Sequence, residues 1–228
     1  MISKIICGAA KLIASLAFVV ILPMALVNLL ISHAFVDLEY RMPWFPQDSY
    51  GFSQQDRLYY AEKTVDALRS DRVESDLSIL TFADGKPLYN EREVEHLVDV
   101  KLVVDNLNLI AVGAAVAFVL CWLVLVVWKQ PRQIISAIVL GSRLLAVLLV
   151  SLGMFAAVSF WQFFAWFHSL FFAGDTWLFR LDDTLIRLFP IRFWQDAVVL
   201  LVGGTLIIAI FLGFLWKPKV GTGVTPTV

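Results

Sequence analysis

Three histidines are the side chains in this sequence best suited to moving protons, because an unperturbed imidazole titrates at about pH 6.5. His33 closes the first long apolar run, His96 lies ahead of the second, and His168 ends the third. If these runs cross a membrane in alternating directions, all three imidazoles fall in the same half of the molecule. Carboxylates flank both His96 and His168, so we predict that these two form a catalytic pair. His33 is left without a role in it.

Charged residues near the two histidines are candidates for supporting roles. Asp99 lies one helical turn after His96, where its carboxylate could fix the imidazole tautomer or simply be a solvated charge. Arg180 and Arg187 could stabilise an oxyanion or contact lipid headgroups, and headgroup contact is the simpler expectation. Asp183 could pair with these arginines.

The segments that must position these residues are strongly apolar. The chain of 228 residues is 60% hydrophobic and only 16% charged, and its mean hydropathy is +0.79, values typical of an integral membrane protein. We predict an all-α membrane protein that forms a single domain over residues 1–228, with a long external loop containing short helices between spans one and two. Four stretches are long enough to cross a hydrocarbon core of about 30 Å. They are residues 12–31, 109–128, 144–167 and 197–216.

Two polar segments, residues 34–102 and 168–196, connect these spans on the side of the histidines. Ser53 with Asp56 three residues later is a capping-box pattern, and Asn90 followed by acidic residues is an N-cap, so helices should begin at both places. A straight helix from Asn90 would hold His96 about 20 Å above the apolar core. We therefore expect this helix to tilt, to break near residues 105–108, or to enter the membrane lower than hydropathy indicates.

Lysines and arginines are distributed unevenly between the two sides. The N-terminal flank, the connection between spans two and three, and the C-terminal flank carry basic residues and no acid. These residues are Lys4, Lys11, Lys129, Arg132, Arg143, Lys217 and Lys219. By the positive-inside rule, both termini face the cytoplasm and the histidines face outward.

Several functional classes lack their sequence signals. Cys7 and Cys121 lie near or within predicted spans, and no CxxC pattern exists for a metal or thiol-exchange site. The chain has no Gly-rich phosphate loop, HExxH or GxSxG motif, and no large basic patch for nucleic acid. We expect no cofactor, no resident metal and no nucleic-acid partner.

Three segments carry a family resemblance. Residues 88–101 (LYNEREVEHLVDVK), 167–172 (FHSLFF) and 183–190 (DTLIRLFP), with the YGFS of residues 50–53, resemble the bacterial lipoprotein intramolecular transacylase (Lit) family. The resemblance extends in order over nearly the whole chain. It implies an acyltransferase of the bacterial plasma membrane whose two functional histidines correspond to His96 and His168.

The activity implied by the resemblance moves the sn-2 acyl chain of a diacylglyceryl-modified lipoprotein to the α-amine of its N-terminal cysteine. The product is a lyso-form N-acyl lipoprotein, and the implied partners are such lipoproteins and membrane lipids. One histidine could take the proton of the attacking amine while another returns a proton to the glycerol oxygen. We assign His96 as the base and His168 as the acid or orienting partner, with the reverse left open.

Two other classes of function fit the same residues. The first is a metal-dependent membrane hydrolase in which His33, His96 and His168 form a three-histidine zinc site. The second is a non-catalytic membrane partner or lipid-binding protein that uses the acidic loop as a docking surface.

Overall fold

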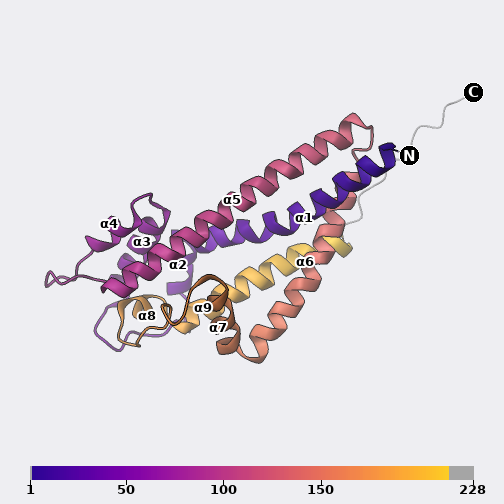
Figure 1. Cartoon of the computed structure of the whole chain (residues 1–228). Helices are drawn as coiled ribbons and strands as arrows, with labels where there is room; N and C mark the ends of the chain where they lie inside the picture. The colour runs from indigo at the N-terminus through magenta and orange to yellow at the C-terminus, as the bar shows by residue number, and fades with distance from the viewer. Residues whose placement is uncertain (1, 216–228) are drawn as a thin grey trace, which may run out of the picture.

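Four long apolar helices dominate the computed structural model, which describes residues 2–215. The described residues form helices and no β-strand, so the predicted fold class is confirmed. In Figure 1 the N-terminus and the turn between α5 and α6 lie at one end of the bundle, and the short helices gather at the other. The four candidate spans are α1 (Ile2–Leu30), α5 (Glu91–Val127), α6 (Gln133–Val158) and the continuous segment Ile191–Leu215.

Both predicted helix starts in the long external connection are confirmed. Ser53 and Asp56 form a reciprocal capping box at the start of α3 (Gln54–Arg69), and Asn90 and Glu93 form another at the start of α5. At 37 residues, α5 is about 56 Å long and so extends well beyond a hydrocarbon core of about 30 Å. Its charged first turns therefore lie outside the hydrocarbon core.

The third span differs from its predicted position at residues 144–167. Helix α6 begins at Gln133 and ends at Val158, and the extended backbone of Ser159 (φ −152°, ψ 93°) separates it from α7 (Phe160–Phe171). Residues 133–143, which precede the predicted span, form the first part of α6. Hydropathy cannot detect this break because the residues on both sides of Ser159 are apolar.

The fourth span begins earlier than the predicted residue 197 and contains π-helical turns. After Pro190 the chain forms α9 (Ile191–Val198), η1 (Val199–Gly204), α10 (Thr205–Ile210) and η2 (Phe211–Leu215). The predicted end of this span at Trp216 and the basic residues Lys217 and Lys219 lie outside the described residues.

Helix α1 packs between α5 and α6. Small side chains permit this close packing: Ala10 and Ala14 of α1 are buried in one cluster with Leu125 of α5 and Ala137 of α6. At Gly141 a β-carbon would lie 2.6 Å from the carbonyl oxygen of Ser15, so only glycine allows α6 to approach α1 at this point.

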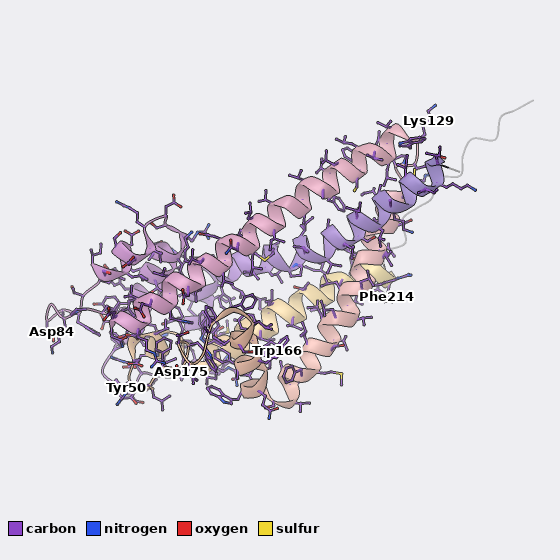
Figure 2. All side chains as sticks on the ribbon, in the orientation of Figure 1. Tyr50, Asp84, Lys129, Trp166, Asp175 and Phe214 are labelled. Atoms are coloured by element: carbon purple, nitrogen blue, oxygen red, sulfur yellow. The ribbon has the colours of Figure 1, made fainter. Side chains whose placement is uncertain are left out.

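The two external connections pack together at the opposite end. One supplies α2 (His33–Tyr40), α3 and α4 (Val73–Ser78), and the other supplies α7 and α8 (Thr184–Leu188). The Tyr40 hydroxyl donates a hydrogen bond of 2.7 Å to the carbonyl oxygen of Leu188, and both residues are fully buried. Figure 2 shows Asp84 and Asp175 of these connections far from Lys129 and Phe214.

Candidate active site

His96 and His168 lie close together although 72 positions separate them in the chain. His96 is in the second turn of α5 and His168 in the last turn of α7, and only 7% and 9% of their surfaces are exposed. Their ring centroids are 6.3 Å apart with an interplanar angle of 21°. The expected break near residues 105–108 does not occur, since α5 is continuous. The change of direction after α6, visible in Figure 1, instead carries α7 and its histidine to the site.

Aromatic rings surround the two imidazoles. Phe172 contacts both, with centroid distances of 4.9 Å to His96 and 5.6 Å to His168. Phe179 lies 5.3 Å from His96, and Trp177 lies 4.7 Å from His168. Such apolar surroundings disfavour a charged imidazole and exclude water.

A single hydrogen bond determines the tautomer of His168. Its Nδ1 lies 2.8 Å from the carbonyl oxygen of Phe164, one turn earlier in α7. A carbonyl oxygen can only accept, so Nδ1 carries the proton and the neutral ring keeps its lone pair on Nε2. Burial lowers the pKa of His168, while the hydrogen bond to Phe164 opposes this effect. The lowered pKa favours a neutral His168 at pH 7, with Nε2 ready to accept a proton.

His96 carries a buried nitrogen without a partner. Its Nδ1 has no hydrogen bond within residues 2–215. Asp99, the residue predicted to orient this ring, is exposed and does not bond to that nitrogen. Buried polar atoms are nearly always paired, and those that are not are often functional. The imidazole of His96 is therefore free to bond to a reacting group.

Glu93, one turn before His96, was not among the predicted site residues. Its carboxylate is 1% exposed and accepts hydrogen bonds from the backbone N–H of Asn90 at 2.8 Å and of Leu185 at 2.6 Å. The second bond attaches α8 to α5 beside the histidines. The capping pattern at Asn90 indicated a helix start, but nothing local could indicate the distant partner in α8.

Arg92 was also missed. Its Nη2 donates a hydrogen bond of 2.6 Å to the carbonyl oxygen of Asp175. Its guanidinium lies 5.4 Å from the centroid of Phe179, the ring that contacts His96. This arrangement holds a positive charge at the edge of the histidine pair and fastens the loop after α7 to α5.

The predicted supporting residues of the second connection have other partners. Arg180 is exposed, and its guanidinium pairs with Asp182 at 2.9 Å. Arg187 is largely buried and pairs with the carboxylate of Asp48 at 3.0 Å. Asp183 precedes α8 and accepts a hydrogen bond of 2.7 Å from the backbone N–H of Arg180. These contacts organise the loop around α8.

His33 lies outside the pair. Its Nε2 is 2.7 Å from a carboxylate oxygen of Asp66 in α3, in an exposed position. Within the described part of the chain, no group of three or more His, Cys, Asp or Glu residues is arranged to hold a metal ion. The geometry therefore gives no support to the three-histidine zinc site.

Comparison with known proteins identifies the family. The family model for the lipoprotein intramolecular transacylase Lit matches residues 11–194. The chain belongs to the Lit family. It is accordingly a membrane acyltransferase, as the resemblance predicted.

Relatives of the Lit-family chain include one protein sequence and two solved structures. An uncharacterised protein of Aquifex aeolicus is 30% identical over 188 residues, which are 81% of this chain and 79% of that protein. An in meso structure of Lit from Bacillus cereus has a TM-score of 0.58 at 19% identity, covering 92% of this chain and 94% of that one. A variant of the same protein with one histidine replaced by arginine has a TM-score of 0.51 at 19% identity, covering 93% and 90%. Both structures share the fold of this chain.

Proposed function

We propose that this Lit-family enzyme moves the sn-2 acyl chain of a diacylglyceryl-modified lipoprotein to the α-amine of the same lipoprotein's N-terminal cysteine. The observation that supports this reaction best is the buried pair of His96 and His168, whose rings lie 6.3 Å apart. Two neutral imidazoles in a water-poor site suit a reaction that needs proton transfer and must avoid hydrolysis.

The reaction forms one bond and breaks one. The amine nitrogen attacks the ester carbonyl carbon to form an amide, and the bond from that carbon to the glycerol oxygen breaks. One proton leaves the nitrogen and is returned to the glycerol oxygen. The product is an isomer of the substrate, so the balance requires neither water nor a co-reactant.

The hydrogen bond from His168 to Phe164 favours the second of the two assignments that the sequence left open. Nε2 of His168 is the basic nitrogen of a ring with a fixed tautomer, so we assign His168 as the base that takes and returns the proton. His96 is then the orienting partner, which donates its single N–H to the carbonyl oxygen of the ester. Arg92 supplies positive charge beside the developing oxyanion.

The intramolecular nature of the reaction explains how so few groups suffice. Amine and ester belong to one molecule, and effective molarities of well-oriented groups can reach roughly 10⁵ M or more. An α-amine with a pKa of about 7.7–8 is already partly neutral at pH 7. The enzyme needs no serine or cysteine nucleophile; it needs to hold the two ends together and move one proton.

Charge distribution supports an outward-facing site in the plasma membrane. The N-terminus and the turn at Lys129 lie at the end of the bundle away from the external connections that carry the histidines (Figures 1 and 2). Basic flanks without acids are typical of cytoplasmic loops. We therefore assign both termini to the cytoplasm and the reaction to the outer face.

Mass spectrometry of a synthetic diacylglyceryl lipopeptide, incubated with the purified full-length protein, tests the reaction. The intact mass should stay constant while fragmentation locates one acyl chain on the N-terminal nitrogen. A lipopeptide whose α-amine is acetylated is the matched control and should not react. Release of free fatty acid would instead indicate a hydrolase, and an unchanged lipopeptide would indicate a non-catalytic lipid-binding protein.

A further inference from the structure

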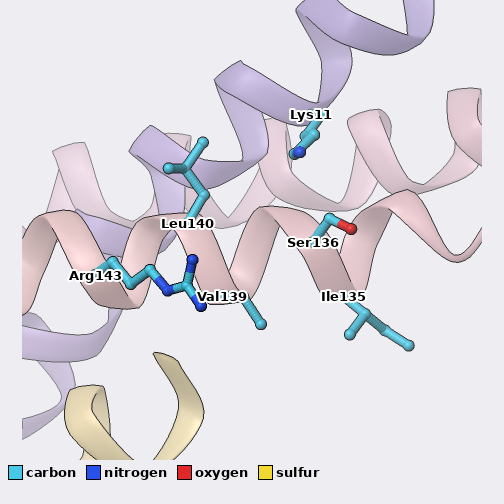
Figure 3. A pocket seen from close by; sticks show the side chains of 6 residues that line it. All are labelled: Lys11, Ile135, Ser136, Val139, Leu140 and Arg143. Atoms are coloured by element: carbon cyan, nitrogen blue, oxygen red, sulfur yellow. The ribbon is translucent and has the colours of Figure 1, made fainter. Parts of the chain in front are cut away.

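We propose that a cavity at the end of the bundle opposite the histidines binds the phosphate group of an anionic glycerophospholipid. The cavity has a volume of about 340 Å³ and lies between α1 and α6 (Figure 3). Its lining residues are Lys11 from α1 and Ile135, Ser136, Val139, Leu140 and Arg143 from α6. None of them belongs to the catalytic site, so the proposal is independent of the reaction above.

The lining residues form one continuous surface. Ser136, Leu140 and Arg143 follow one another at spacings of four and three, so they lie on one face of α6. Figure 3 shows Lys11 extending from α1 toward this face. The close approach of α6 to α1 at Gly141, beside Leu140, keeps the two walls of the cavity at a fixed separation.

The two cations that line the cavity have no carboxylate with which to pair. Residues 2–30, 109–158 and 197–215, which include the described residues around the cavity, contain no Asp or Glu. Within residues 2–215, Lys11 forms no ion pair, and Arg143 donates a hydrogen bond only through its Nε–H, to the carbonyl oxygen of Gly213 at 2.9 Å. The Arg143 guanidinium also lies 5.3 Å from the centroid of the Phe214 ring, a contact that brings no full counter-charge. Four of the five N–H donors of the guanidinium remain available. No described residue therefore supplies a counter-charge to Lys11 and Arg143, and a bound anion would supply one.

Phosphate of a lipid headgroup fits this combination of groups. Ammonium, guanidinium and hydroxyl donors are the groups that bind phosphate oxygens, and basic pockets between transmembrane helices on the cytoplasmic side bind anionic headgroups. Lys11 directly precedes the apolar run of residues 12–31, and a lysine near the end of a span can extend its ammonium to the headgroups. Ile135, Val139 and Leu140 add apolar surface that suits glycerol and acyl carbons and would not help to bind inorganic phosphate.

Native mass spectrometry of the full-length protein tests the site. Wild-type protein should retain phosphatidylglycerol in preference to phosphatidylcholine. A double variant that carries Lys11→Gln and Ser136→Ala should retain about ten-fold less phosphatidylglycerol. Each substitution removes a hydrogen-bond donor to the charged phosphate. Lys4 is exposed on the same helix and does not line the cavity. The Lys4→Gln variant should therefore retain the lipid as the wild type does.

Three outcomes would overturn the proposal. An equal loss of phosphatidylglycerol from the Lys4→Gln variant and from the double variant would mean that a basic surface attracts the lipid without a specific site. Equal retention of phosphatidylcholine and phosphatidylglycerol would remove the selectivity for the anion. Binding of inorganic phosphate without retention of phosphatidylglycerol would mean an anion site that is not a lipid site. The melting temperature and the acyl-transfer activity of each variant should be measured as controls for correct folding.

Discussion

The imidazole of His168 donates its Nδ1 proton to the carbonyl oxygen of Phe164, four residues earlier in the same helix, at 2.8 Å. The bond holds the ring against α7 and leaves Nε2 as the only nitrogen that can accept a proton. We assign His168 as the base for this reason. The buried Nδ1 of His96 has no comparable hydrogen-bond partner within residues 2–215.

Replacing either histidine of the pair should abolish most of the activity. His168→Ala removes the base and His96→Ala removes the orienting partner, so each should lower kcat by roughly 10²–10⁴-fold. Initial rates of lipopeptide isomerisation, followed by fragmentation mass spectrometry, measure the loss. The third histidine provides the control: His33→Ala breaks only a contact with Asp66 and should retain activity close to that of the wild type.

The pH dependence of kcat should show a loss of activity toward acid. Burial lowers the pKa of His168 below its ordinary value, so the neutral, basic form persists to lower pH than in a free histidine. Protonation below that pKa removes the base, and kcat therefore rises as pH increases through it. Profiles of kcat and kcat/KM from pH 4 to 9 test this, with neutralisation of the substrate amine expected above roughly pH 7. A kcat that falls between pH 5 and pH 7 would contradict the assignment.

Arg92 should matter more than Arg180 although only Arg180 was predicted from the sequence. Arg92→Ala removes a positive charge beside His96 and releases the carbonyl of Asp175, so kcat should fall about ten-fold or more. Arg180→Ala removes an exposed ion pair with Asp182 and should change kcat less than about two-fold. Equal effects of the two substitutions would argue against a role for Arg92 at the transition state.

Phe172 should determine how much substrate is lost to hydrolysis. Its ring contacts both imidazoles, so Phe172→Ala admits water to the pair and should increase the ratio of free fatty acid to N-acyl product. This ratio does not depend on the amount of folded enzyme, so it can be compared even if the variant is less stable than the wild type. The neighbouring Phe171 is 39% exposed and contacts neither imidazole closely, so Phe171→Ala should leave the ratio unchanged.

Local signals were predicted well from the sequence. The capping box at Ser53 and the N-cap at Asn90 depend on residues within three positions, and the structure has both, with a capping box at each. The meeting of His96 with His168 was predicted from the alternation of the spans and from the family resemblance. The break at Ser159 was not predicted, since one extended residue between two apolar helices leaves no trace in hydropathy.

Contacts between the two external connections could not be predicted from local patterns. Arg187 was expected to face lipid headgroups or an oxyanion, but it pairs with Asp48, 139 positions away. Glu93 was interpreted only as part of a helix start. In both cases the partner is set by how α8 packs against the first connection, and that arrangement depends on the whole fold.

The hydrogen bond from Leu185 to Glu93 joins residues that are 92 positions apart, and this sets an order of assembly. At a synthesis rate of about 5–20 residues per second, the carboxylate waits roughly 5–20 s for its partner to emerge. During that interval Glu93 caps only its own helix, and the third span and α7 must already be inserted before α8 can dock. The hydrogen bond that attaches α8 beside the histidine pair therefore forms late, after the first three membrane spans have been made.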